Sequence, residues 1–406
     1  MRFSLVALMC VAGSAFAAQP PSVALDAPSA ASTLQYDALD LAKLQAEDTR
    51  AALAGQPRRY AVTHRIKSIE VSADTSSGGE WTTLVDGRLI WRLPIRADGA
   101  VSIDVGFSRL RLPQGAELWL SDTQRSVVRG PYTDADNPRS GILALPMVPG
   151  SEAVLELIVP ADKRELVDLQ LGFVNHGYRS SSAADAVKSG TCNVDTGCAQ
   201  GDAWRQQIRS AAHFTFTADA GLSCTGQLVN RSNGDRAPLF LTANHCLKDA
   251  PIAATVVVYW KYESPTCREV NSGANGNPLP LTIAAATQSG ATLLATYAPS
   301  DMTLLRLSQA PPALADAYWS GWDRRNLAPT SAVTIHHPQG HEKRISFEND
   351  ALAISDYEPT PAGDATTHLK VFDWDVGTTE SRSSGAALWN ADKRIVGTLH
   401  GGFAAC

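Results

Sequence analysis

The distribution of cysteines limits the fold of this 406-residue chain more than any other feature, because six of the seven lie between residues 192 and 406. An even number of cysteines in an exported chain is typical of a disulfide framework, although the sequence alone leaves the pairing open. No pair has the C-x-x-C spacing of a zinc site, so we expect no metal. We therefore expect three disulfides among Cys192, Cys198, Cys224, Cys246, Cys267 and Cys406.

The first residues, MRFSLVALMCVAGSAFA, have the parts of a secretory signal peptide. Arg2 is the basic start, an apolar run follows, and Ala15 and Ala17 make a small-residue cleavage site. The run is too short to span a bilayer as a stable helix, and no later segment is apolar enough for an anchor. We expect residues 1–17 to be removed, with Cys10, and the mature protein to be secreted, extracellular or periplasmic.

Composition and periodicity divide the rest of the chain. Residues 18–58, rich in Ala, Ser, Pro and Gln, read as an N-terminal pro-segment with one helix-like stretch, 39–55. Residues 59–178 hold no cysteine, and their short apolar or alternating runs between Gly, Pro and Asp predict a β-sandwich. The small polar residues of 179–188 are typical of a linker and of proteolysis sites. Short β runs between turns in 189–406 predict a pair of antiparallel barrels.

Three residues of the second half suggest nucleophilic catalysis. Ser384 lies in TESRSSGAALW, and a serine needs a base, usually a histidine that a carboxylate orients. His245, in LTANHC, follows an apolar run and should end a strand, and Asp301 opens the apolar run DMTLLRL. Each alone is more often structural. Together they predict a site in a cleft between the barrels. One barrel would supply His245 and Asp301, and the other Ser384.

Between Cys192 and Cys406 the chain contains the motifs CNVDTGC, SCTGQLVN, FLTANHC, VVVYWKY, YAPSDMTLLRL, WSGWDRRN, IHHPQGHEKRIS, TTHLKV, GTTESRSSGAAL and GTLHGG. In these motifs it resembles the bacterial lysyl endopeptidases, which are secreted serine proteases. The resemblance is nearly continuous over this range, and the β-rich segment before it is similar to the family's propeptide. It implies an all-β fold, a chymotrypsin-like double β-barrel preceded by a β-sandwich-like propeptide.

The resemblance also implies roles for single residues. Ser384 would be the nucleophile, His245 the general base and Asp301 the residue that orients it, in an endopeptidase that forms an acyl-enzyme and cuts after lysine. The backbone N–H groups of Arg382 and Ser384 would face the oxyanion. Positions beside the triad or substrate would be Trp374, His400 and Gly401. The implied disulfides are Cys192–Cys406, Cys198–Cys267 and Cys224–Cys246.

The expected partners follow from the same reading. They are protein or peptide substrates and the protein's own propeptide, and we expect a monomer without a cofactor or a membrane partner. The net charge of −6 offers no basic field, so we expect no nucleic-acid partner.

Two positions near the nucleophile depart from the family pattern. Arg382 stands where the family usually has glycine, which suits unusual backbone angles. Ser383 stands where digestive relatives have an aspartate that pairs with the new N-terminus, so we expect activation without insertion of that terminus. The propeptide should assist folding, cover the cleft and be cut after Lys188, which makes Ser189 the first residue; Arg179 is the alternative site.

The end of the chain leaves the specificity open. Cys406 precedes the positions of the family's pocket aspartate, closing strand and terminal helix, so lysine preference is inherited from the resemblance alone. A fragment and a degenerate relative that binds peptides without cutting them are both compatible with this. A carbohydrate-binding module built on the N-terminal sandwich is a third class. The enzyme is favoured because all three triad positions are filled.

Overall fold

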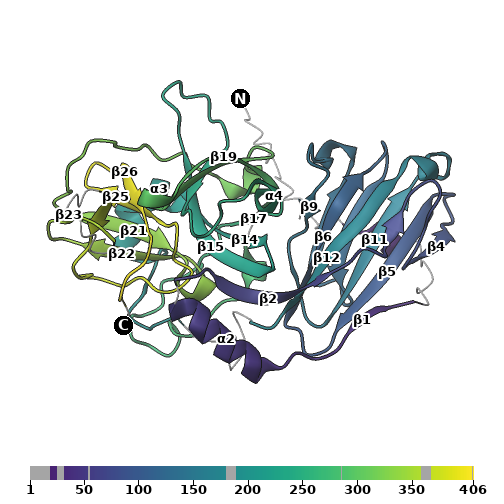
Figure 1. The fold of residues 1–406 in the computed structure, drawn as a ribbon, viewed down its shortest axis with the longest axis horizontal. Coiled ribbons are helices and arrows are strands. Elements are labelled where there is room, and N and C mark those ends of the chain that lie inside the picture. The colour runs from purple at the N-terminus through teal and green to yellow at the C-terminus, as the bar shows by residue number, and fades with distance from the viewer. Residues whose placement is uncertain are drawn as a thin grey trace, which may run out of the picture.

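The computed structural model describes residues 19–24, 32–53, 55–179, 189–284, 286–357, 367–404 and 406. The predicted signal peptide and nearly all of the predicted linker lie outside these residues. The described chain is mainly β and forms an N-terminal and a C-terminal domain, connected by a long strand (Figure 1). None of the described helices is long and apolar enough to cross a membrane.

The N-terminal domain is a sandwich of two β layers. One layer has the order β1 (Leu34–Tyr36), β5 (Leu89–Ala97), β11 (Glu152–Val159), β7 (Glu117–Asp122) and β8 (Val128–Tyr132), with β4 (Glu80–Thr83) paired to β5. The other has the order β10 (Val148–Pro149), β6 (Ser102–Arg111), β12 (Asp168–Gly177) and β2 (Arg58–Arg65), with β3 (Glu70–Val71) and β9 (Leu143–Ala144) at its margins.

The core of this sandwich follows from the alternation of side chains along a strand. Alternate residues Trp91, Leu93 and Ile95 of β5 are buried, and so are alternate residues of β6 in the facing layer. All of them belong to one apolar cluster, as expected for two sheets packed face to face. The predicted helix of this part of the chain is α2 (Leu41–Leu53), which lies beside β2 (Figure 1).

Strand β2 belongs to both domains. It pairs antiparallel with β12 on one side and with β15 (Ala220–Val229) of the C-terminal domain on the other, so a single sheet runs through both domains (Figure 1). The approach is close, because a Cβ on Gly221 would lie 2.9 Å from the Tyr60 ring and 3.0 Å from Ala61 Cβ. Sequence periodicity predicted the strand but not its second partner.

The first barrel of the C-terminal domain closes through one glycine. Its strand order is β19 (Ala291–Tyr297), β20 (Met302–Leu307), β16 (Leu239–Thr242), β15, β14 (Ala211–Thr217), β17 (Val257–Trp260) and β18 (Ala286–Ser289). Strands β18 and β19 are joined by Gly290 alone, with φ +83°. Gly290 donates to Val256 O and accepts from Ser308 N. Because the two end strands of the order are joined at one point, the sheet curls around an aromatic core that includes Phe214, Phe240 and Trp260.

The second sheet has the order β13 (Val194–Asp195), β22 (Arg344–Glu348), β21 (Ala332–His336), β25 (Ala387–Asn390) and β26 (Ile395–Thr398). Its Ile335 and Trp389 pack with Ile208 of the short helix α3 (Arg205–Ser210). The predicted all-β class, a double barrel preceded by a β-sandwich, is confirmed. The remaining α-helices and strands of the described residues are α1 (Pro21–Ala24), α4 (Ala250–Ala253), β23 (Ala353–Ser355) and β24 (His368–Lys370).

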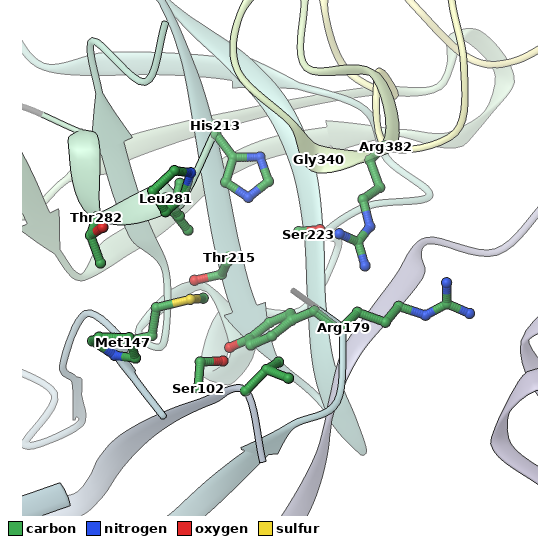
Figure 2. A pocket seen from close by; sticks show the side chains of 14 residues that line it. Ser102, Met147, Arg179, His213, Thr215, Ser223, Leu281, Thr282, Gly340 and Arg382 are labelled. Atoms are coloured by element: carbon green, nitrogen blue, oxygen red, sulfur yellow. The ribbon is translucent and has the colours of Figure 1, made fainter. Parts of the chain in front are cut away.

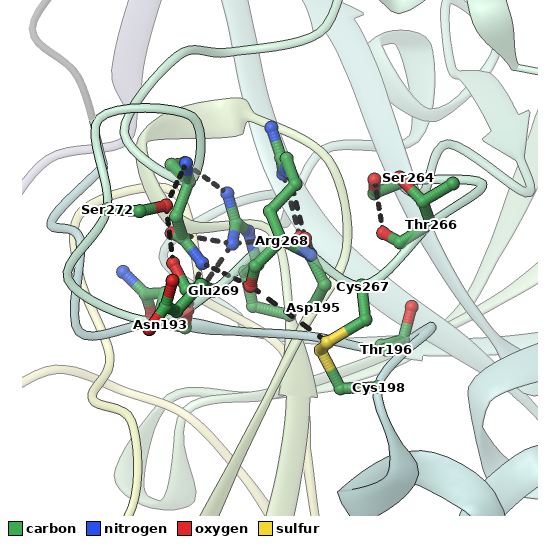
Figure 3. The surroundings of a disulfide bond; sticks show 12 residues. Asn193, Asp195, Thr196, Cys198, Ser264, Thr266, Cys267, Arg268, Glu269 and Ser272 are labelled. Carbon is green, nitrogen blue, oxygen red and sulfur yellow. Dashed lines mark hydrogen bonds and ion pairs between the residues drawn. A yellow bond between two sulfur atoms is a disulfide. The ribbon is translucent and has the colours of Figure 1, made fainter.

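A disulfide and a buried ion network fix the start of the C-terminal domain. The three disulfides are Cys192–Cys406, Cys198–Cys267 and Cys224–Cys246, the pairs that the family resemblance implies. Next to Cys267, the Arg268 guanidinium lies 2.7 Å from Asp195 Oδ1 (Figure 3). Arg344 then joins Asp195, at 2.8 Å, to Glu342, at 2.6 Å, with all three side chains fully buried.

Removing one member of this network should be costly, because it leaves buried carboxylates short of a positive partner. We expect Arg344→Met to lower the free energy of unfolding by about 3 kcal/mol, measured by urea denaturation with the disulfides intact. The matched control is Arg325→Met, which removes the pair between exposed Arg325 and partly buried Asp323 and should change stability by no more than about 1 kcal/mol. Equal effects of the two substitutions would contradict the assignment.

Candidate active site

His245 and Asp301 meet because two neighbouring strands bring them together. Strand β16 ends three residues before His245, and Asp301 directly precedes β20, which pairs with β16. His245 Nδ1 lies 2.6 Å from Asp301 Oδ2, and Asp301 Oδ1 accepts the backbone N–H of His245 at 2.7 Å. Asp301 is 2 % exposed. A carboxylate that accepts from Nδ1–H leaves the lone pair on Nε2, the atom needed as a base; here Nε2 lies 3.8 Å from Cys246 Sγ.

Ser384 lies in the turn before β25, against the end of the first barrel. Its carbonyl accepts the N–H of Thr225 at 2.9 Å. The next residue, Gly385, has φ +81°, and a Cβ there would lie 2.4 Å from Thr225 O and 2.2 Å from Thr242 Oγ1. Only glycine fits this approach. The turn therefore sits at the contact between the barrels, beside the segment that leads from Thr242 to His245.

The Cys224–Cys246 disulfide completes this arrangement. Cys246 follows His245, and Cys224 precedes Thr225, the residue that binds the Ser384 carbonyl. The segments of the base and of the serine are therefore both attached to β15. Within the described chain the Ser384 hydroxyl makes no hydrogen bond. Catalytic contacts of this kind are often long without substrate and shorten when it binds.

The backbone at Arg382 has the geometry of a donor loop. Ser383 N–H donates to Glu380 O at 3.0 Å, and Thr225 Oγ1 donates to Arg382 O at 3.0 Å. Arg382 has φ +72°, in the left-handed region that favours glycine. Among the described residues, neither the N–H of Arg382 nor that of Ser384 has an acceptor. Two such free donors in one turn could receive a negative oxygen.

The side chain of Arg382 points away from this turn, toward the N-terminal domain. It donates from Nη1 to Gln339 O at 3.1 Å and from Nη2 to Arg59 O at 3.0 Å. Together with Arg179 and His213 it lines a cavity of about 90 Å³ between the domains (Figure 2). Burial, together with the charges of Arg58 and Arg179, lowers the pKa of Arg382 to about 9.

The buried neighbour Ser383 has a structural contact. Its Oγ lies 2.7 Å from His336 Nδ1, and burial lowers the pKa of His336 to about 3, so this imidazole is neutral. Ser383 is fully buried, whereas Ser384 is partly exposed. Of the two adjacent serines, Ser384 is therefore the one that a substrate can reach.

A second histidine extends the site. His400 lies parallel to His245, with ring centroids 5.5 Å apart, and His400 Nε2 is 3.7 Å from Asp301 Oδ2. His368 Nε2 lies 3.0 Å from His400 Nδ1. Tyr357 stacks on His400 with a centroid distance of 3.7 Å. His400 therefore lies between the His245–Asp301 pair and an aromatic ring.

The aromatic ring that stacks on His400 is Tyr357, which was not predicted. Trp374 stacks on no ring of a described residue, and its place beside the triad stays a prediction. Gly401, also predicted near the triad, lies next to Tyr357, because a Cβ on it would be 2.8 Å from Tyr357 Oη. Tyr357 was missed because it stands in a short polar segment, where no period or motif distinguishes it.

Two groups of side chains in the described chain have enough potential ligands for a metal ion. One is His245, Asp301 and His400, whose ligand atoms lie within 4.8 Å of one another. The other consists of Glu348, Asp350 and Asp375 near the surface. Acidic groups of this kind are common without an ion, and in the first group the Asp301 carboxylate already accepts two hydrogen bonds from His245.

Comparison with known proteins gives the family. Residues 33–176 match the lysyl endopeptidase N-terminal domain, and residues 186–406 match the lysyl endopeptidase C-terminal domain. A lysyl endopeptidase of Pseudomonas aeruginosa is 29 % identical over 374 residues, covering 87 % of this chain and 76 % of that protein.

Solved structures show more distant likeness. The active form of the Rv3671c protease from M. tuberculosis has a TM-score of 0.30 and 13 % identity, covering 51 % of this chain and 76 % of that one. For Deg5 the TM-score is 0.32 and the identity 12 %, covering 49 % of this chain and 82 % of that one. The family rests on the two domain matches, which together span most of the sequence: the chain belongs to the lysyl endopeptidase family of proteases.

Proposed function

We propose that this protein is a secreted serine endopeptidase that hydrolyses peptide bonds through an acyl-enzyme. The observation that carries the proposal is the short His245–Asp301 contact beside a turn that combines Ser384 with two free backbone donors. A histidine base oriented by a buried carboxylate is the arrangement that activates a serine hydroxyl.

The steps follow from these positions. Ser384 Oγ attacks the peptide carbonyl while His245 Nε2 takes its proton. The carbonyl oxygen becomes negative and accepts hydrogen bonds from the N–H groups of Arg382 and Ser384, each worth about 3 kcal/mol in the barrier. His245 then protonates the departing amine, which leaves an ester on Ser384. Water, deprotonated by His245, attacks this ester and releases the acid.

Lysine preference is part of the proposal and rests on family membership. A pocket for an ammonium group needs a carboxylate, because an unpaired buried charge is costly. We assign no described carboxylate to that role. The Pseudomonas aeruginosa relative carries the name lysyl endopeptidase, and substrate preference after lysine is the corresponding expectation for this chain.

The N-terminal domain is proposed to act as a propeptide that assists folding and is cut off in the 179–188 linker. Its strand β2 continues the sheet of the first barrel, and its Arg59 carbonyl accepts from the side chain of Arg382. A segment that extends the enzyme's own sheet is well placed to guide its folding. Export by the signal peptide agrees with three disulfides, which persist in oxidising compartments.

A phosphonyl fluoride probe tests the central claim. We expect labelling at Ser384 in the processed protein, located by peptide mass spectrometry, and none in Ser384→Ala. His245→Ala should abolish labelling, and Asp301→Asn should slow turnover of a peptide ester by about 10⁴-fold, because the imidazole then takes the wrong tautomer. A folded protein that is not labelled would instead be a peptide-binding relative without catalytic activity.

Cleavage mapping tests the lysine preference. On a denatured protein substrate, we expect the new C-termini to be lysines, and N-terminal sequencing of the secreted enzyme should begin at Ser189. Ser384→Ala, secreted under the same conditions, is the control and should keep the linker uncut if the enzyme processes itself. Cuts without regard to lysine would reject the preference, and a different first residue would reject the Lys188 site.

The left-handed backbone at Arg382 predicts the effect of restoring glycine. A non-glycine residue in this region is strained by about 1 kcal/mol, so we expect Arg382→Gly to raise turnover of the processed enzyme by up to about fivefold. Arg382→Ala is the matched control, because it removes the same side chain but keeps the strain. Unchanged or lower turnover in Arg382→Gly would show that Arg382 is no handicap.

A further inference from the structure

A carboxylate lies directly behind the donor turn without a positive partner. Both oxygens of Glu380 accept from Gly190 N–H, at 3.1 Å each, and Oε2 accepts from Asn193 Nδ2 at 3.0 Å. Within the described chain, Glu380 has no ion pair. Burial raises its pKa, although the hydrogen bonds from Gly190 and Asn193 and the more distant charge of Arg344 act in the opposite direction.

Glu380 is connected to the donors that face the oxyanion. Its carbonyl accepts from Ser383 N–H at 3.0 Å, and its own N–H donates to Ser383 Oγ at 3.3 Å. The two bonds close a turn over residues 380–383 that contains Arg382 and leads into Ser384. An interaction that holds the Glu380 side chain in place therefore also restrains the backbone that presents the N–H groups of Arg382 and Ser384.

The residue before Gly190 brings a latent charge close to Glu380. Ser189 is 2 % exposed, and its N–H donates to His341 Nδ1 at 3.1 Å. Because one residue separates the two backbone nitrogens, Ser189 N lies within about 4 Å of Gly190 N, which Glu380 binds. Hydrolysis of the bond between Lys188 and Ser189 consumes one water and yields a carboxylate on Lys188 and an α-ammonium on Ser189.

We propose that Glu380 is a positioning residue for the oxyanion hole, and that its counter-ion is the α-ammonium created at Ser189 by processing. This rests on the proposed function. In the uncut chain residues 189–190 already contact His341 and Glu380, with Ser189 buried, so they must leave this position for the bond to be cut. When they return after cleavage, Ser189 brings an ammonium to the carboxylate in place of a neutral amide.

This inference replaces the expectation that activation proceeds without a new terminus. That expectation considered only Ser383, the residue before the nucleophile, which has no charge. The carboxylate lies three residues earlier, at Glu380, and reaches the start of the processed domain from there. The carboxylate that is absent at position 383 is thus supplied by position 380 of the same turn.

Other charges near Glu380 also stabilise its carboxylate and so determine how much the ammonium adds. Arg344 and Arg58 both act on Glu380 at longer range, and Arg58 belongs to the N-terminal domain. Its field is lost when that domain leaves, so the processed enzyme depends more on the new terminus. Burial lowers the pKa of His341 to about 3, so its ring is neutral, accepts a hydrogen bond, and does not compete with the ammonium as a cation. The charged groups that act on His341 are Arg382, Arg344, Arg58 and Glu342.

The expected pH dependence follows from the ammonium. Its ordinary pKa is about 8, and a neighbouring carboxylate raises it. The ion pair is therefore complete below the ordinary pKa and is lost as the pH rises through the raised value. Activity of the processed enzyme should fall on the alkaline side for this reason.

The test compares processed proteins by their rate of phosphonyl fluoride labelling across pH. Wild type should lose rate above about pH 8. Glu380→Gln should be labelled at least tenfold more slowly at neutral pH, and its rate should not fall further above about pH 8. Glu380→Asp should recover part of the neutral rate and part of this alkaline decrease. A glycine inserted between Lys188 and Ser189 moves the ammonium by one residue and should act like Glu380→Gln. Glu269→Gln, which changes an exposed carboxylate, is the control and should behave like wild type.

The outcomes separate this inference from the proposed function. The role of Glu380 is overturned if Glu380→Gln and the insertion variant are both labelled at the wild-type rate and show the wild-type decrease at alkaline pH. Absence of labelling in wild type at every pH overturns the proposed function instead. If Glu380→Gln fails to fold, as judged by thermal unfolding, the insertion variant decides alone, because it keeps every side chain.

Discussion

The candidate site depends on Thr225, one buried residue of strand β15 that binds both segments of the proposed catalytic machinery. Its N–H donates to Ser384 O at 2.9 Å, and its hydroxyl donates to Arg382 O at 3.0 Å and accepts from His337 N at 3.2 Å. Its carbonyl accepts from Thr242 Oγ1 at 2.9 Å. The preceding residue is bridged to Cys246, next to His245. The proposed serine nucleophile, histidine base and oxyanion donors are therefore all held by neighbouring groups of strand β15, and such chemistry requires this positional precision.

The same strand carries the N-terminal domain. Ser223 of β15 is opposite Arg58 of β2, two residues before Thr225. Backbone pairing of this kind is specific in register, because a shift by one residue would turn every side chain to the other face. Docking of the N-terminal domain and formation of the site thus use neighbouring backbone groups of one strand. This proximity gives a physical reason why a β-rich N-terminal domain accompanies the protease domain in a single chain.

Local chemistry was predictable from the sequence, and contacts between distant segments were not. His245, Asp301 and Ser384 stand out because each follows or opens an apolar run and departs from it in residue type. Tyr357 was not predicted, because the sequence shows which residues are aromatic but not which ring faces His400. Glu380 was overlooked for the same reason, since its partner is a backbone N–H 190 residues away. Strand periodicity likewise predicts that β2 exists, whereas the edge that it extends depends on the packing of two domains.

Arg382 has a strained backbone in the C-terminal domain and a side chain that contacts the N-terminal domain. The left-handed backbone at this position disfavours any side chain by about 1 kcal/mol. While the N-terminal domain is docked, the Arg59 carbonyl accepts a charged hydrogen bond from the guanidinium, a type of bond worth about 1.5–3 kcal/mol, and the Gln339 carbonyl of the C-terminal domain accepts a second. The same docking buries the guanidinium beside Arg58 and Arg179, which lowers its pKa to about 9. When the N-terminal domain leaves, the backbone strain remains, the Arg59 bond is exchanged for water, and the repulsion from the two arginines ends. An arginine in place of the family's glycine therefore links this turn to the N-terminal domain through one favourable and one unfavourable interaction.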